Sequence, residues 1–142
     1  MEQQLLIQEF HRMVAKINAT SFATEVGDFY QGESAVLACI AFMEQAGELP
    51  LPSAISARLH LARGTVTATL RSLERKHLVL RETMPDDRRH VRVVLTEAGH
   101  FQVEHKLAEV NQWCSRMIVS MGENDFTLLL TMLNKAIACM GL

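Results

Sequence analysis

The chain has 142 residues, of which 49% are hydrophobic and 21% charged, and its formal net charge at pH 7 is −2. This composition is typical of a globular protein and excludes a disordered chain. No apolar run approaches the 18 or so residues of a membrane span, and the acidic, polar N-terminus does not resemble a signal peptide. We therefore expect a cytoplasmic protein without a membrane partner. The cysteines Cys39, Cys114 and Cys139 lie far apart without CxxC spacing, which indicates neither a zinc ribbon nor a disulfide framework.

Positive charge is concentrated in residues 53–99. This segment carries nine basic and five acidic side chains, so it is +4 while the remainder of the chain is −6. A local basic patch on an acidic body suits contact with phosphates, and the acidic remainder limits non-specific binding. The alternative is chance clustering of charges on solvated faces.

Apolar residues at helical spacing predict the N-terminal elements. The 4-3-4 spacing of Leu6, Phe10, Met13 and Ile17 predicts an amphipathic helix over residues 3–18. Residues 19–32 mix Thr, Ser and glycine with scattered aromatics, which predicts a loop with a short helical turn. A broad apolar face predicts a second helix over residues 33–45, and Gly47 is placed to close it.

The central segment predicts a helix-turn-helix. A short helix begins near Pro52 or Ser53, since proline is tolerated in a first helical turn, and it ends near His60. The next helix begins at Ala62 or Arg63 and runs to about residue 77, with one apolar face. Helices joined by so short a turn cross at a steep angle, as they do in a helix-turn-helix.

A β-hairpin with a basic tip is predicted to follow. Residues 78–84 and 91–96 alternate in polarity and are rich in β-prone side chains. The segment between them opens with Pro85, followed by two aspartates, which is turn chemistry. Thr96 then stands where it can cap the N-terminus of the next helix.

Two amphipathic helices complete the chain. The first, over residues 97–121, keeps an apolar position every third or fourth residue for nearly three heptads, and Gly122 separates it from the last helix. This seam is longer than one subunit needs to cover its own core. We therefore expect the helices at both chain ends to form a homodimer, because helix-turn-helix units bind two half-sites about one helical turn apart; an intramolecular bundle is the alternative. The predicted interface residues are Leu6, Phe10, Met13, Ile17, Val110, Met117, Met121, Phe126, Leu130, Leu133 and Ile137.

Together these elements predict a mostly α fold with a small β-hairpin wing, of the α+β class. A winged helix-turn-helix DNA-binding domain is expected over residues 33–96. Dimerisation helices are expected in residues 1–32 and 97–142, so that the whole chain forms one unit.

The helix that begins at Arg63 has the chemistry to read a major groove. If Val66 faces the core, a rotation of about 100° per residue places Gly64 and Ala68 near the opposite pole. Arginine pairs with guanine edges or phosphates, threonine does either more weakly, and small residues permit close approach of the backbone. The expected DNA contacts on this helix are Arg63, Gly64, Thr65, Thr67, Ala68 and Arg71.

The hairpin tip adds a second expected DNA contact, made by Asp87, Arg88 and Arg89. A narrow minor groove attracts inserted arginine. We expect Asp87 to orient one guanidinium through a charge-assisted hydrogen bond while the other projects. The alternative for this tip is an ordinary solvated turn.

The segment TVTATLRSLERKHLVLRETMPDDRRHVRVVLTEAG resembles the core of the MarR family of bacterial transcriptional regulators. The residues that match the family pattern are Arg63, Thr65, Val66, Thr67, Asp87, Arg88, Arg89, Leu95, Thr96 and Gly99. The resemblance implies an obligate homodimer that binds double-stranded DNA at a pseudo-palindromic operator, often as a repressor released by a small molecule, oxidant or metal. Three positions depart from the pattern: His60 replaces a turn glycine, Ala62 replaces a capping serine, and Ala68 replaces a commonly basic residue.

The effector is less constrained by the sequence. In the cleft that the resemblance implies, His11, Arg12, Tyr30 and Cys39 are candidates to contact a small anionic or phenolic ligand. One alternative is a zinc-responsive regulator that uses the spaced pairs His100–Glu104 and His105–Glu109. A second is a winged-helix protein–protein interaction module without a DNA role. No phosphate-binding glycine loop, nucleophile elbow or HExxH motif is present, so we expect neither an enzyme nor a cofactor.

Overall fold

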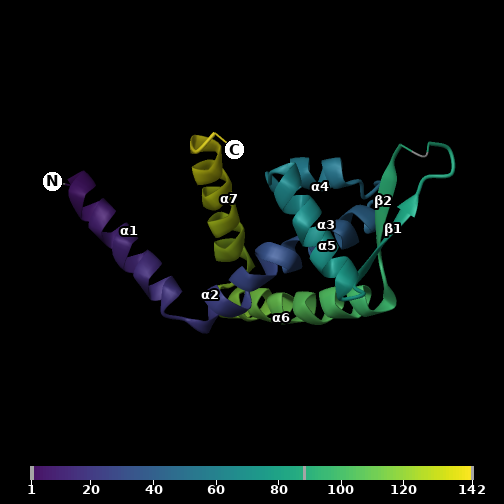
Figure 1. Cartoon of the computed structure of the whole chain (residues 1–142). Helices are drawn as coiled ribbons and strands as arrows, with labels where there is room; N and C mark the ends of the chain where they lie inside the picture. The colour runs from purple at the N-terminus through teal and green to yellow at the C-terminus, as the bar shows by residue number, and fades with distance from the viewer. Residues whose placement is uncertain (1, 88, 142) are drawn as a thin grey trace.

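A computed structural model describes residues 2–87 and 89–141, so that Arg88 lies outside the described residues. The elements are α1 (Glu2–Asn18), α2 (Ser21–Glu25), the 3₁₀ turn η1 (Gly27–Tyr30), α3 (Gly32–Gln45), α4 (Pro52–Leu59), α5 (Arg63–Arg75), β1 (Val79–Thr83), β2 (Val91–Leu95), α6 (Glu97–Met121) and α7 (Glu123–Cys139). In Figure 1, α6 runs beneath the central helices and the hairpin, while α1 projects away from them and α7 stands beside them. The predicted fold class, mostly helical with one hairpin, is confirmed.

The main hydrophobic core lies among α3, α4, α5, the hairpin and the first turns of α6. Its fully buried large side chains are Val36, Leu37, Ile40, Ile55, Val66, Leu70, Leu73, Val79 and Val93. The apolar face predicted for the helix from Arg63 is therefore the face that α5 buries. This core fixes the rotation of α5 about its own axis, and so decides which of its side chains face solvent.

The turn between α4 and α5 is formed without the glycine or the cap that would favour it. His60 takes a left-handed conformation, with φ 54° and ψ 41°, which is unfavourable for a residue with a β-carbon. Ala62 supplies no side-chain hydrogen bond to the first turn of α5. Two internal bonds compensate in part: Ser56 Oγ donates to the Leu61 carbonyl at 2.6 Å, and the Leu61 N–H donates to the Ser56 carbonyl at 3.1 Å.

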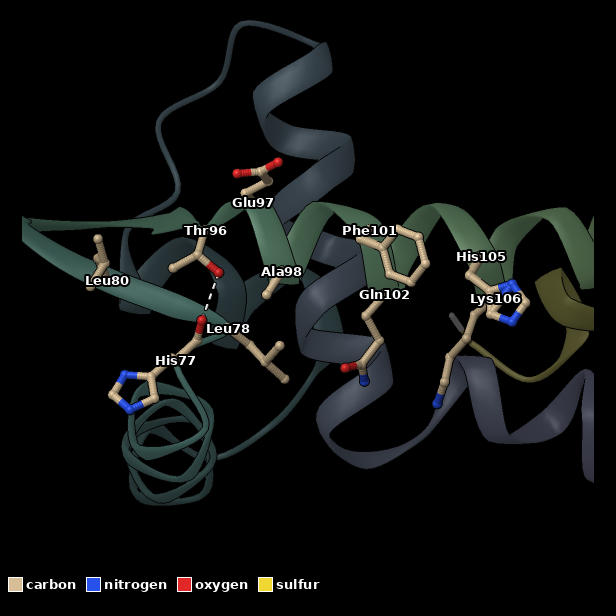
Figure 2. Close-up of a pocket in the computed structure, with 10 residues that line it drawn as sticks. All are labelled: His77, Leu78, Leu80, Thr96, Glu97, Ala98, Phe101, Gln102, His105 and Lys106. Atoms are coloured by element: carbon tan, nitrogen blue, oxygen red, sulfur yellow. Dashed lines mark hydrogen bonds between the residues drawn. The ribbon is translucent and has the colours of Figure 1, made fainter.

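The antiparallel hairpin is joined to α6 by a compact group of bonds around Thr96. Its register pairs Val79 with Leu95. The Thr96 N–H donates to the Leu78 carbonyl at 3.1 Å, and its hydroxyl donates to the His77 carbonyl at 2.7 Å, as Figure 2 shows. The same hydroxyl accepts from the Gly99 N–H at 3.0 Å, which confirms Thr96 as the predicted N-cap of α6. We call this group the α6 corner.

Residues 21–30 are more ordered than the predicted loop. They form α2 and η1, and η1 buries Phe29 to 2% exposure against Ala38 and Val110. At the other end of α2, Phe22 packs edge-on against Trp113, with ring centroids 5.6 Å apart. This packing corrects the expectation for Val110. Its side chain is only 4% exposed and belongs to the core of its own subunit, not to a dimer seam.

Helices α1 and α7 present apolar faces that the rest of the described chain does not cover. Neither helix contains a buried residue. The predicted interface side chains that are exposed are Leu6, Phe10, Met13, Ile17, Met121, Leu130, Leu133 and Ile137, while Met117 and Phe126 are half-buried. None of the described helices combines the length and the hydropathy needed to cross a membrane.

Candidate DNA-binding surface

Helix α5 turns the predicted recognition face to solvent. Val66, Leu70 and Leu73 are buried, whereas Gly64 and Ala68 on the opposite side are exposed. Arg63, Thr65 and Arg71 are exposed as well, and Thr67 is half-buried. An exposed helix face of this kind can enter the major groove of duplex DNA.

The C-terminal half of α5 is fixed to α3 through one carboxylate. Glu33 accepts a hydrogen bond from the Ser72 hydroxyl at 2.5 Å and from the Lys76 ammonium at 2.6 Å. The Lys76 and Ser72 hydrogen bonds favour the charged form and lower the pKa of Glu33 below its ordinary value of 4.5. Glu33 was not among the predicted site residues, because a pairing across some forty residues leaves no local signal in the sequence.

The wing and α5 converge on one hollow. Arg63 and Thr67 of α5 line it together with Arg89 and His90 of the wing, and its volume is about 280 Å³. The α3–α4 loop holds the two sides together, since the Val93 N–H of β2 donates to its Pro50 carbonyl at 2.8 Å. The structure thus brings together residues from the two segments that were predicted to contact DNA.

This hollow also contains residues that were not among the predicted DNA contacts. Pro52 and Ser53 of α4 line it, and His90 comes from the end of the wing loop. Pro52 and Ser53 reach the hollow because α4 packs beside β2, and no local sequence pattern predicts this packing.

The aspartate of the wing tip does not have the partner we expected among the described residues. Asp87 Oδ1 accepts from the backbone N–H of Arg89 at 3.0 Å, and Oδ2 lies 3.5 Å from His90 Nε2. The aspartate therefore shapes the turn, which leaves the Arg89 guanidinium free of it. The predicted contact at Arg88 lies outside the described residues.

Some arginines of the hairpin are paired with carboxylates, so fewer arginines are available to contact phosphates. Arg92 pairs with Glu82 across the hairpin at 2.7 Å, and Arg81 pairs with Glu74 at 3.3 Å. Within the described residues, no acidic partner lies within salt-bridge distance of Arg63, Arg71 or Arg89. These three guanidinium groups, together with the exposed Arg75 near the end of α5, contribute unpaired positive charge to the surface.

Two of the four predicted effector residues share a cavity. Tyr30 and Cys39 line a hollow of about 420 Å³ whose other walls come from η1, α3 and α4. His11 and Arg12 lie instead on α1, outside this lining, and Arg12 pairs with Glu9 on the same helix. Burial raises the pKa of the Cys39 thiol, which keeps it protonated and weakly nucleophilic.

Of the two histidine pairs considered for zinc, only His105–Glu109 is formed. His100 lies 3.4 Å from Glu44 of α3 instead of pairing with Glu104, while His105 lies 3.9 Å from Glu109. Within residues 2–87 and 89–141, no group of three His, Cys, Asp or Glu side chains is arranged to hold a metal ion.

Three features are now established: α5 has a solvated basic face, a basic hairpin lies beside it, and a hydrophobic core lies behind both. Together they define a winged-helix DNA-binding domain. Comparison with known proteins leads to the same class. The model of the MarR family matches residues 31–91. A search of curated protein sequences gives no significant match.

Solved structures share the fold along almost the whole chain. FabT of Streptococcus pneumoniae in complex with DNA is 21% identical, with 95% of this chain and 97% of that chain covered and a TM-score of 0.74. MepR of S. aureus in complex with DNA is 20% identical, with 94% and 98% covered and a TM-score of 0.64. MepR bound to ethidium bromide is also 20% identical, with 94% and 95% covered and a TM-score of 0.64. Residues 31–91 thus match the MarR family, and the whole chain has the fold of FabT and MepR, two proteins solved in complex with DNA.

Proposed function

We propose that the protein is a homodimeric, ligand-responsive repressor that binds a pseudo-palindromic operator. The observation that carries this proposal is the pair of uncovered apolar faces on α1 and α7, at the two ends of the chain. A row of large exposed apolar side chains along a helix is typical of a protein interface. A second copy of the chain is the occupant that also supplies a second recognition helix, as two operator half-sites require.

The dimer is tested by placing a charge on the apolar face of α1. Phe10 is 58% exposed on that face, whereas Gln8 lies on the opposite side of the same helix. We expect the wild type and Gln8→Asp to have the mass of a dimer at micromolar concentration by light scattering, and Phe10→Asp to shift toward monomer. A wild-type monomer at that concentration contradicts the proposal.

The operator symmetry is tested by selecting duplexes from a random-sequence library with the full-length protein. A selected consensus made of two inverted half-sites about one helical turn apart supports the dimeric mode. A single asymmetric site, bound by one chain per duplex, contradicts it. Failure to select any sequence would favour the protein–protein module over a sequence-specific regulator.

Ligand response is proposed for the cavity that contains Tyr30 and Cys39. Its volume of about 420 Å³ lies in the range of small-molecule sites, and it combines aromatic walls with the guanidinium of Arg58, which also pairs with Glu48 at 3.0 Å. Helix α4 contributes Arg58 and Leu59 to this cavity, and Pro52 and Ser53 to the hollow beside α5. A ligand that displaces α4 therefore acts on the recognition helix through one short element.

The response is tested by fluorescence anisotropy on the selected duplex. Benzoate tests a planar aromatic anion opposite Arg58, and ethidium tests a planar aromatic cation of the kind that the MepR structure contains. Because ethidium also binds DNA, its arm is read by thermal stabilisation of the protein without DNA. We expect at least one probe to stabilise the protein, and Ala35→Leu, which fills part of the cavity, to weaken that stabilisation. If neither probe binds, the cavity is not the effector site for planar aromatic ligands.

Repression itself is tested with a reporter whose promoter overlaps the selected operator. We expect expression to fall when the protein is produced and to recover with Arg63→Ala, which removes a guanidinium from the exposed face of α5. Increased expression on production of the wild type would identify an activator instead.

A further inference from the structure

Resting on the proposed function, we infer that Thr67 reads DNA through its methyl group and selects thymine at one position of each half-site. Threonine on a recognition helix can contact bases in two ways. Its hydroxyl can hydrogen-bond to base edges, and its methyl group can pack against the 5-methyl of thymine in the major groove. The structure favours the second way.

The hydroxyl of Thr67 already has a partner within its own helix. Thr67 Oγ1 donates to the Arg63 carbonyl at 2.9 Å, so its hydrogen is not available to a base acceptor. What Thr67 offers to a ligand is an oxygen lone pair and a methyl group. The side chain lines the hollow between α5 and the wing, beside Arg63 and Arg89, and so lies within the proposed DNA surface.

The composition of α5 limits what else can read the bases. From Arg63 to Leu73 the helix has no Asn, Gln, Asp or Glu, the side chains that pair with adenine or cytosine in the major groove. Arg63 and Arg71 can pair with guanine or with phosphates. Apart from the exposed Thr65 hydroxyl, the remaining exposed groups are small or carry methyl groups, which favours thymine as the base that they distinguish.

Gly64 supports a close approach of α5 to the bases. A β-carbon at this position would meet no atom within 4 Å, and its φ is not in the left-handed region. Neither packing nor backbone conformation therefore requires glycine, which is a poor helix former. The glycine is explained if DNA must approach the backbone closely at this position. A methyl–methyl contact likewise requires the DNA to come within van der Waals distance of α5.

The test uses two variants that separate the two parts of the side chain. Thr67→Val keeps the methyl and removes the hydroxyl, whereas Thr67→Ser keeps the hydroxyl and removes the methyl. Thr69 is the matched control, because its hydroxyl also donates to its own helix, to the Thr65 carbonyl at 2.8 Å, but it lies nearer the buried side. The probes are the duplex selected by the wild type and copies in which single thymines are replaced by deoxyuridine, which lacks the 5-methyl.

We expect deoxyuridine at one thymine of the half-site to weaken wild-type binding roughly three- to fivefold, the equivalent of one buried methyl. Thr67→Ser should weaken binding to the thymine duplex by a similar factor and should be insensitive to that deoxyuridine. Thr67→Val should bind within about twofold of the wild type and keep the sensitivity. Together these measurements form a double-mutant cycle, which gives the coupling between one protein methyl and one DNA methyl.

The inference is overturned if every deoxyuridine duplex binds as tightly as its thymine counterpart, or if Thr67→Val loses affinity while Thr67→Ser does not. It is also overturned if Thr69→Ser removes the sensitivity as Thr67→Ser does. Each of these results leaves sequence-specific binding intact. A wild-type protein that selects no duplex at all would instead contradict the proposed function.

Discussion

Replacing Gly99 by alanine should destabilise the fold through a single clash at the α6 corner. A β-carbon on Gly99 would lie 2.1 Å from the carbonyl oxygen of Leu78, where ordinary contacts begin near 3.4 Å. The obstacle is backbone, so no side-chain rotation relieves it. That carbonyl also accepts the Thr96 N–H at 3.1 Å, and moving it by more than an ångström breaks the bond.

The expected loss follows from these two effects. Overpacking of a close-packed site costs about 1–3 kcal/mol, and the lost hydrogen bond adds about 1 kcal/mol. We therefore expect Gly99→Ala to lower the free energy of unfolding by about 3 kcal/mol. In a chain of this length this corresponds to a decrease in Tm of roughly 10 °C.

Gly64→Ala is the matched control, because an added β-carbon there meets nothing within 4 Å. It should raise the free energy of unfolding by about 0.5–1 kcal/mol, since alanine is the better helix former. Urea unfolding monitored by circular dichroism measures both variants, at one fixed subunit concentration because association contributes to stability. If Gly99→Ala unfolds within 0.5 kcal/mol of the wild type, the corner is more compliant than its geometry indicates and the reasoning is refuted.

Three further predictions concern the wing, a cap and a carboxylate. Arg89→Ala should weaken binding to the selected duplex about tenfold at fixed salt and reduce the slope of log K against log salt by about 0.9, and unchanged anisotropy titrations would count against the wing. Thr96→Ala should cost about 1–2 kcal/mol in urea unfolding, because it removes the N-cap of α6, whereas Thr131→Ala, which loses only a bond within its own exposed helix, should change little. The pKa of Glu33 is lowered, so its stabilising contribution is present above its ordinary pKa of 4.5 and is lost as pH falls through the lower folded value. Glu33→Gln should therefore lower the urea midpoint at pH 7, with the gap to the wild type closing as the pH falls below 4.5; a gap independent of pH would contradict this.

The sequence predicted those elements whose signals are local. The helix from Arg63 has a periodic apolar face, and the same face is buried in the structure. Gly47 was expected to close the helix before it, and it does so with φ 71° and a bond from the Glu48 N–H to the Met43 carbonyl at 2.9 Å. Caps and periods of this kind need only neighbouring residues, so the sequence alone contains them.

The features that the sequence did not predict depend on contacts between distant residues. Nothing in residues 21–30 indicates that Phe29 will be buried, because its partners come from α3 and α6. Val110 was assigned to the dimer interface for the same reason. A heptad pattern shows which side chains are buried, but not whether a partner subunit or the chain's own core covers them. Likewise His100 pairs with Glu44, 56 residues away in sequence, instead of with its helical neighbour Glu104.

The uncovered faces of α1 and α7 have a consequence for how gene expression depends on the amount of protein. If operator binding needs two chains, and single chains predominate at low abundance, the dimer concentration varies as the square of the total. Halving the number of molecules then reduces the binding-competent form fourfold, and the regulated promoter responds more steeply than it would to a monomer. The apolar side chains around Phe10 and Leu130 would thus set the protein level at which the promoter switches.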